Sequence, residues 1–268
     1  MTCLRRTALD LIRLRDPHAK ARAVLDLPEG DAGALPSPWQ IDTALHLDEP
    51  AGVPGRGDKP VLMKARDMPP QRSLATPEGH AALVHSLVHI ECNAVDLALD
   101  ALWRFAGMPE AYYTDWLRVA REEALHFQLL SQHLESLGWH YGDFPAHDGL
   151  WFMADKTRQD PMARMAIVPR TLEARGLDAS PAVQRKLVGL GDRRGSAILD
   201  IILRDEIGHV AIGNHWFRWL CGQQGLDPVA HYQRLSRQYD APRLNGPFNL
   251  AARRAAGFEE AELAQLGQ

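Results

Sequence analysis

The stretch VAREEALHFQLL, Val119–Leu130, places a glutamate and a histidine on what is otherwise the apolar side of a helix. Residues three apart lie on one helix face, so Glu123 and His126 share a stripe with Val119 and Phe127. A carboxylate buried alone loses several kcal/mol of solvation and would take up a proton instead. The stretch therefore predicts a core helix whose polar pair is held there by a compensating partner.

The same arrangement returns in LRDEIGHVAIG, Leu203–Gly213, where Glu206 and His209 again interrupt an apolar stripe. Each Glu-x-x-His follows a helix with one further glutamate. Glu91 precedes Glu123 by 32 residues, and Glu173 precedes Glu206 by 33. The chain thus reads as two similar helical hairpins, each giving a Glu from its first helix and a Glu-x-x-His from its second.

Working outward from these hairpins, the periodicity predicts an all-α fold, because no alternating β pattern runs beyond a few residues. In the first hairpin, Thr76 caps a helix that closes at Gly107, and the next helix stops at Gly138. In the second, we expect a helix from about 150 to Gly176 and another from about 180 to Gly222 or Gly225.

The rest of the chain flanks this bundle. We expect residues 1–76 to form two short helices, the second capped by Asp16, and then a Pro/Gly-rich arm that wraps the body. Residues 77–225 form the four-helix bundle. Residues 226–268 form a tail with a helix to about 239, a turn, and a short helix near 258–266.

The composition of the chain limits the classes of protein, partner and compartment to be expected. The chain has 268 residues, 46% of them hydrophobic and 24% charged, which allows a sizeable core. Its net charge of −4 shows no basic excess, so nucleic acid is not the expected partner. Three cysteines without a CxxC motif argue against disulfides and a thiolate zinc site. With no secretory signal or membrane span, we expect a cytoplasmic protein, and a homodimer stays open.

Two divalent cations would compensate four carboxylates, and the two imidazoles would complete the coordination. The predicted ligands are Glu91, Glu123, His126, Glu173, Glu206 and His209. Carboxylate-rich sites with one imidazole per metal suit iron or manganese, and we favour iron. Glu173 is the weakest member, because Arg170 or Arg175 could pair with it.

The six residues resemble the metal site of the ferritin-like di-iron superfamily. The phrases VPRTLEARGLD, DEIGHVAIGNHWF and PFNLAARRAAGF, with the proline-rich arm ahead of the bundle, resemble more specifically the bacterial family DUF455. The resemblance implies a ferritin-like four-helix bundle with two metals per chain. That superfamily includes O2-activating hydroxylases, desaturases and oxidases, among them a tRNA-modifying monooxygenase, as well as iron-storage proteins.

Several neighbours could support the ligands. Glu122 and Asp205 flank the two stripes and either accept a hydrogen bond from a ligand imidazole or are solvated charges. Tyr112 and Trp116 lie on the metal-facing stripe, where core packing is favoured over lining a substrate pocket. His85 and His89 project away from Glu91, which favours solvent or packing against the arm.

Four functions compete on this evidence. The favoured one is an oxidase or monooxygenase that takes O2, electrons from a donor and a small organic substrate. The second is ferroxidase or metal storage, which requires a large cage. The third is RNA hydroxylation, suggested by basic residues on the third and fourth helices and opposed by the acidic net charge. The fourth is a metal-free helical interaction module.

Overall fold

The computed structural model describes residues 2–28, 39–70 and 72–267, and this part of the chain is mostly helical, as predicted. It forms two compact units, residues 1–149 and residues 150–268. Each unit contains one long helical hairpin, and each is described below by itself.

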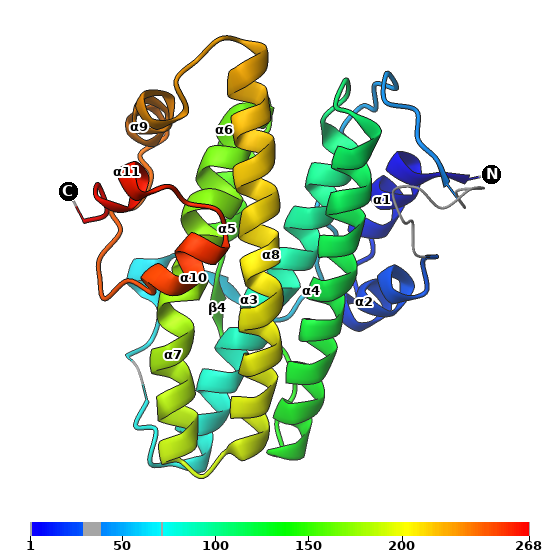
Figure 1. Ribbon diagram of the computed structural model, residues 1–268. Coiled ribbons are helices and arrows are strands. Elements are labelled where there is room, and N and C mark those ends of the chain that lie inside the picture. The colour runs from blue at the N-terminus through cyan, green and yellow to red at the C-terminus, as the bar shows by residue number, and fades with distance from the viewer. Residues whose placement is uncertain (1, 29–38, 71, 268) are drawn as a thin grey trace. The chain divides into compact units, whose positions relative to one another are not determined.

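In the first unit, two short helices cover a long hairpin (Figure 1). The helices are α1 (Leu4–Ile12), α2 (Pro17–Leu25), α3 (Pro77–Arg104) and α4 (Glu110–Ser136). Two predicted caps are confirmed: the Asp16 carboxylate accepts from His18 N at 2.9 Å, and Thr76 Oγ1 accepts from Gly79 N at 3.1 Å. α1 packs on α3 and α2 packs on α4, each with its apolar face inward.

The Pro/Gly-rich segment runs over this unit and is tied to it through backbone groups and through side-chain ion pairs such as that of Glu49 with Arg104. Its described residues contain η1 (Ala65–Asp67) and two short strands that pair in parallel with other parts of the unit: β2 (Trp39–Gln40) with β1 (Thr2–Cys3), and β3 (Leu62–Met63) with β4 (Ala146–His147). The buried Arg5 donates to Asp42 O at 3.1 Å and to Trp103 O at 2.8 Å, which joins the segment to α3. Part of the predicted arm, residues 29–38 and 71, lies outside the described residues.

The second unit contains α5 (Gly149–Lys156), α6 (Pro161–Ile167), a π-helical turn η2 (Val168–Glu173), α7 (Ala174–Gly189) and α8 (Arg193–Gln223). Two predicted boundaries are wrong. A helix does not run unbroken from about 150, because Asp160 caps a new one at Pro161 by accepting from Met162 N at 2.9 Å. Nor does the helix end at Gly176; it continues to Gly189, and the turn before α8 uses Gly191 at φ +78°.

The helical segment of η2 and α7 contains two prolines, and side-chain hydrogen bonds accompany both of them. Pro169 lies within η2, where the π-helical widening accommodates the ring and Thr171 Oγ1 donates to Ala166 O at 2.8 Å. Pro181 leaves the Leu177 carbonyl without its usual N–H, and Asn249 Nδ2 donates to Leu177 O at 3.2 Å in its place.

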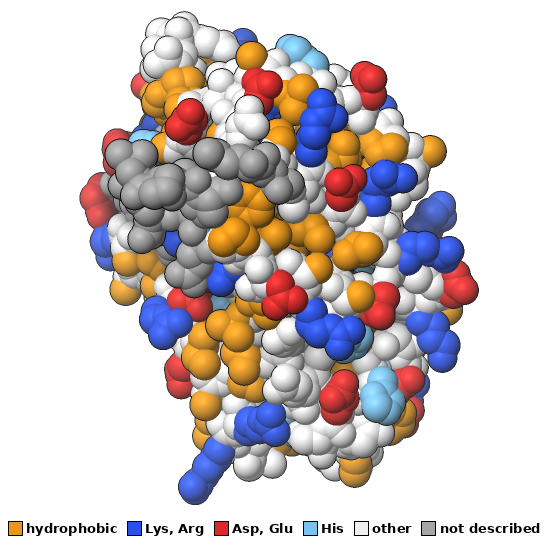
Figure 2. All heavy atoms as spheres, turned by 90° about the vertical axis from the view of Figure 1, so that its right-hand side faces the viewer, with side chains coloured by type: hydrophobic (Ala, Val, Ile, Leu, Met, Phe, Trp, Pro, Cys, Tyr) orange, Lys and Arg blue, Asp and Glu red, His pale blue; other side chains and the backbone are white. Residues whose placement is uncertain are grey.

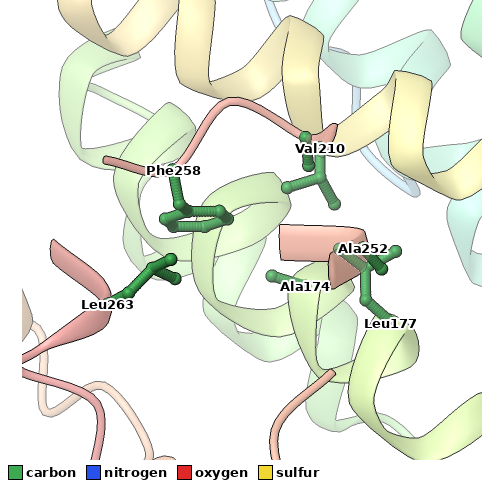
Figure 3. Close-up of a cluster of buried hydrophobic side chains, with 7 residues drawn as sticks. Ala174, Leu177, Val210, Ala252, Phe258 and Leu263 are labelled. Carbon is green, nitrogen blue, oxygen red and sulfur yellow. The ribbon is translucent and has the colours of Figure 1, made fainter. Parts of the chain in front are cut away.

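The tail packs onto the second hairpin. It contains α9 (Pro228–Gln238), α10 (Leu250–Ala255) and α11 (Glu260–Leu263), with α10 lying across α7 and α8 (Figure 1). The short last helix predicted near 258–266 is present as α11, and α10 is a further helix that the sequence did not predict. Figure 3 shows the contact, in which Phe258, Leu263 and Ala252 meet Leu177 and Val210 in one buried cluster. The burial of these apolar side chains fixes the tail to the hairpin.

The described surface carries mixed charge. On the face drawn in Figure 2, acidic and basic side chains are interspersed and exposed apolar side chains occur in scattered groups. By length and composition, α3 could cross a membrane, but 67% of its apolar window is buried inside the protein. That burial is typical of the core helix of a soluble protein.

Gly213 on α8 allows the close approach of η2, and we predict that Gly213→Ala destabilises the protein. A Cβ at this position would lie 2.5 Å from Pro169 Cβ, closer than two carbons can pack. We expect a loss of about 1–3 kcal/mol in the free energy of unfolding, as for other overpacked cores. Urea unfolding followed by circular dichroism measures it.

The matched control is Gly208→Ala on the same helix, where an added Cβ meets nothing within 4 Å. Its higher helix propensity should stabilise the protein by up to about 1 kcal/mol. Equal stability of the two variants would contradict this account of the helix contact.

Candidate metal centre

Three predicted ligands converge inside the first hairpin. Glu91 comes from α3, and Glu123 and His126 come from successive turns of α4. His126 Nδ1 lies 3.4 Å from Glu91 Oε2 and 3.4 Å from Glu123 Oε2. Each of the three offers a ligand atom within 4.8 Å of the others. The exposed fractions are 4% for Glu91 and 0% for the other two, so water cannot solvate this charge.

Burial and mutual charge set the protonation of this group. Burial raises the pKa of the Glu91 carboxyl to about 7, and the nearby Glu123 carboxylate adds to the rise while His126 opposes it. Burial lowers the pKa of His126, but the hydrogen bonds and charges of Glu123 and Glu91 raise it to about 12. In the metal-free protein the imidazolium therefore serves as the counter-ion of the carboxylates.

The donor set fits a hard or borderline divalent cation. Two carboxylates and one imidazole are the ligands that iron and manganese accept. A cation between these atoms would replace the proton on His126 and neutralise the buried acids. The arrangement is thus suited to hold a metal as well as a proton.

The second hairpin repeats part of this arrangement. Glu206 and His209 are buried on α8, with His209 Nδ1 3.9 Å from Glu206 Oε2. Glu173 is half-buried at the last position of η2, and a π-helical turn is often found at functional sites. Arg170, one suggested partner of Glu173, is buried and donates to Glu262 of α11. Arg175, the other, has an exposed side chain.

The neighbouring candidates have other contacts. Asp205 accepts from Arg204 Nε at 2.8 Å and Arg204 Nη2 at 3.1 Å. Tyr112 is buried and donates its hydroxyl to Ala101 O at 3.2 Å, which joins α4 to α3. Trp116 is buried beside the Tyr112 ring. Glu122 is half-buried on α4. Tyr112 and Trp116 are thus both buried, and whether they support the ligands stays a prediction.

His85 and His89 are buried beneath the loop that follows α4, and His89 also lines a pocket with arm residues such as Pro60, in line with the predicted packing against the arm. His85 Nε2 accepts from Gly142 N at 2.9 Å, and His89 Nδ1 lies 2.8 Å from the Tyr141 hydroxyl. Burial lowers both pKa values to about 4, so the two imidazoles are neutral near pH 7. They fasten the loop to α3.

Sequence reasoning missed a buried arginine network in the second unit. Arg253 donates to Asp178 Oδ2 at 2.6 Å from Nη2 and to Asp178 Oδ1 at 3.0 Å from Nε, while Arg170 pairs with Glu262. Asn214 donates to Ala256 O at 2.8 Å. The three phrases VPRTLEARGLD, DEIGHVAIGNHWF and PFNLAARRAAGF therefore contact one another. The arginines and acids within these phrases were the signal in the sequence that could have indicated these ion pairs.

This network also bears on the basic third and fourth helices. Arg164 and Arg170 are buried at 2% and 1% exposure, and Arg164 donates to Ala154 O and Thr157 Oγ1. Seven basic residues of these two helices suggested RNA binding, and the other five are exposed: Arg175, Arg185, Lys186, Arg193 and Arg194. Two of the seven therefore serve the core of the second unit and are unavailable to a nucleic acid.

Comparison with known proteins places the chain among relatives. It is 46% identical over 264 residues to a protein of Haemophilus influenzae described as an uncharacterized protein. The aligned region covers 94% of this chain and 89% of the Haemophilus influenzae protein. No solved structure matches the chain. Residues 13–264 match the family described as "Protein of unknown function (DUF455)". The chain belongs to the DUF455 family.

Proposed function

We propose that this protein is a ferritin-like oxidase or monooxygenase with a dinuclear metal centre, iron in preference to manganese, that uses O2 to oxidise a small organic substrate. The observation that carries the proposal is the buried group of Glu91, Glu123 and His126, with both carboxylates 3.4 Å from one imidazole nitrogen. The same Glu and Glu-x-x-His pattern on the second hairpin supports a second set of ligands.

In this proposal each hairpin supplies half of the ligands. Glu91, Glu123 and His126 bind from the first, and Glu173, Glu206 and His209 bind from the second. Bound iron would supply the O2 and electron-transfer chemistry. The chain would orient the ligands on rigid helices, exclude water with the surrounding apolar stripe, and hold on His126 the proton that leaves when metal binds.

Residues outside the hairpins favour an enzyme over a storage protein. The segment of residues 1–76 and the tail of residues 226–268 have no use in a minimal four-helix cage subunit. The described parts of both are packed and hydrogen-bonded, as the Arg5 and Arg253 contacts show. Such additions commonly shape access to an enzyme's site.

We predict that the protein binds two Fe(II) per chain and that ligand variants from either hairpin bind fewer. Glu123→Ala removes a ligand of the first hairpin and His209→Ala one of the second, so each should lose at least one metal. Elemental analysis after anaerobic loading and desalting counts the metal.

Glu135→Ala is the matched control, because Glu135 is an exposed glutamate on α4, the helix that carries Glu123. It should keep both metals. Retention of two metals in both ligand variants would refute the assignment of these residues.

We predict that metal binding releases protons and weakens as the pH falls. Metal requires an ionised Glu91 and a neutral His126, whose pKa values in the metal-free protein are raised to about 7 and about 12. Above about pH 7, His126 alone must lose its proton; below it, Glu91 must lose one too. Mn(II) affinity should therefore fall more steeply with decreasing pH below that value.

Calorimetric Mn(II) titration in buffers of different ionisation enthalpy measures this proton release. Glu135→Gln, a change at an exposed site on α4, should leave it unchanged. An identical release on both sides of pH 7 would show that Glu91 does not titrate in this way.

We predict that the Fe(II)-loaded protein reacts with O2 as a small oligomer. After anaerobic loading, admission of O2 should produce an absorption band in the near-ultraviolet or visible range, followed by stopped-flow spectroscopy. Sedimentation velocity of the same sample separates the two functions. A cage-sized particle would favour storage, and a loaded protein that is inert to O2 would exclude the oxidase.

A further inference from the structure

A cavity of about 600 Å³ lies within the second unit, between α9 and the segment that carries α10 and α11. Its volume falls in the range of pockets that hold small organic molecules. Apolar and aromatic side chains line part of it, including Val229, Tyr232, Phe258 and Leu266. Ser236 and two deeply buried arginines supply polar groups.

Arg170 and Arg253 line this cavity although they are 1% and 0% exposed. Each uses part of its guanidinium in an ion pair, Arg170 with Glu262 and Arg253 with Asp178. Among the described residues, no acceptor faces Nε and Nη1 of Arg170 or Nη1 of Arg253. A buried donor without an acceptor is costly, so three such donors beside one cavity point to an acceptor that enters it.

Aromatic rings hold these two guanidiniums in place. The guanidinium carbon of Arg170 lies 4.8 Å from the ring centroids of both Phe217 and Tyr232. Phe258 lies between the arginines, 5.3 Å from that of Arg170 and 5.2 Å from that of Arg253. Phe258 is itself anchored in the apolar cluster of Figure 3. The donors are thus preorganised, which lowers the entropy lost when a ligand binds.

The charge around the cavity favours an anion. Arg170 and Arg253 are already matched by Glu262 and Asp178, but two more arginines, Arg237 and Arg243, line the cavity with exposed side chains. One exposed acid, Asp240, also lines it and lies 3.6 Å from Lys156. Guanidinium donors match the planar oxygens of carboxylates and the oxygens of phosphates.

We propose that this cavity binds a small organic anion. Its carboxylate or phosphate group accepts hydrogen bonds from Arg170 and Arg253, and a flat apolar portion packs against Tyr232 and Phe258. Arg237 and Arg243 supply the opposing charge at the mouth. None of the proposed metal ligands lines this cavity, so the proposal of anion binding does not depend on the dinuclear centre.

The test is calorimetric titration of the full-length metal-free protein with phenyl phosphate, benzoate and inorganic phosphate at low salt. We expect saturable binding of phenyl phosphate or benzoate; the tighter of the two identifies the anionic group. Inorganic phosphate should bind more weakly than phenyl phosphate, because it lacks the apolar portion. No saturable binding of either aromatic probe would overturn the proposal, as would inorganic phosphate binding as tightly as phenyl phosphate.

Two variants locate the binding. Arg253→Lys keeps the charge beside Asp178 but loses the fork of donors, and should weaken the preferred probe about tenfold. Since this residue is buried, the double variant Arg237→Gln with Arg243→Gln provides a test at exposed positions, with an expected loss of about fivefold. Circular dichroism verifies that each variant is folded.

The matched control neutralises two exposed arginines of the same unit that do not line the cavity, Arg185→Gln with Arg194→Gln. Its affinity should equal that of the unchanged protein. Equal losses in the two double variants would mean that the probes respond to general charge, and the assigned site would be wrong. Because the readout is direct binding without metal, failure here leaves the metal-count experiment unaffected.

Discussion

The charge balance inside the first hairpin constrains the rest of the molecule. Glu91, Glu123 and His126 are almost fully buried, and the carboxylates have been taken out of water at a cost of several kcal/mol each. A proton on His126 and an elevated pKa at Glu91 lower that cost without abolishing it. An apolar residue at each position would be cheaper, so stability alone gives no reason for these side chains. The cation binding proposed above would supply that reason.

Local signals made much of the fold predictable. Asp16, Thr76 and the glycines after α3 and α4 act through contacts within a few residues, so the sequence indicated both the ends of the helices and the first hairpin. The second hairpin was harder because Gly176 resembles a helix stop. Its helix continues because η2 absorbs Pro169 and α8 approaches closely at Gly213, and both are properties of packing rather than of the local sequence.

The candidate site and the arginine network likewise differ in how far the sequence could predict them. The i, i+3 spacing alone brings Glu123 and His126 together, and hairpin geometry brings Glu91 to them, so periodicity was enough to nominate all three. The contacts of Arg170 with Glu262 and of Arg253 with Asp178 join residues more than seventy positions apart. No periodic pattern encodes such pairs, since they depend on how the tail folds back onto α7 and α8.

The π-helical turn η2 connects these two parts of the second unit. Arg170 and Glu173 lie three residues apart within it, one on the tail cavity and the other a proposed metal ligand. Pro169 and the contact with Gly213 hold the turn against α8, the helix that carries Glu206 and His209. The aromatic neighbours of Arg170 and the contact of Pro169 with Gly213 therefore fix the position of this turn from two sides, so the packing that orients Arg170 also orients the backbone of Glu173.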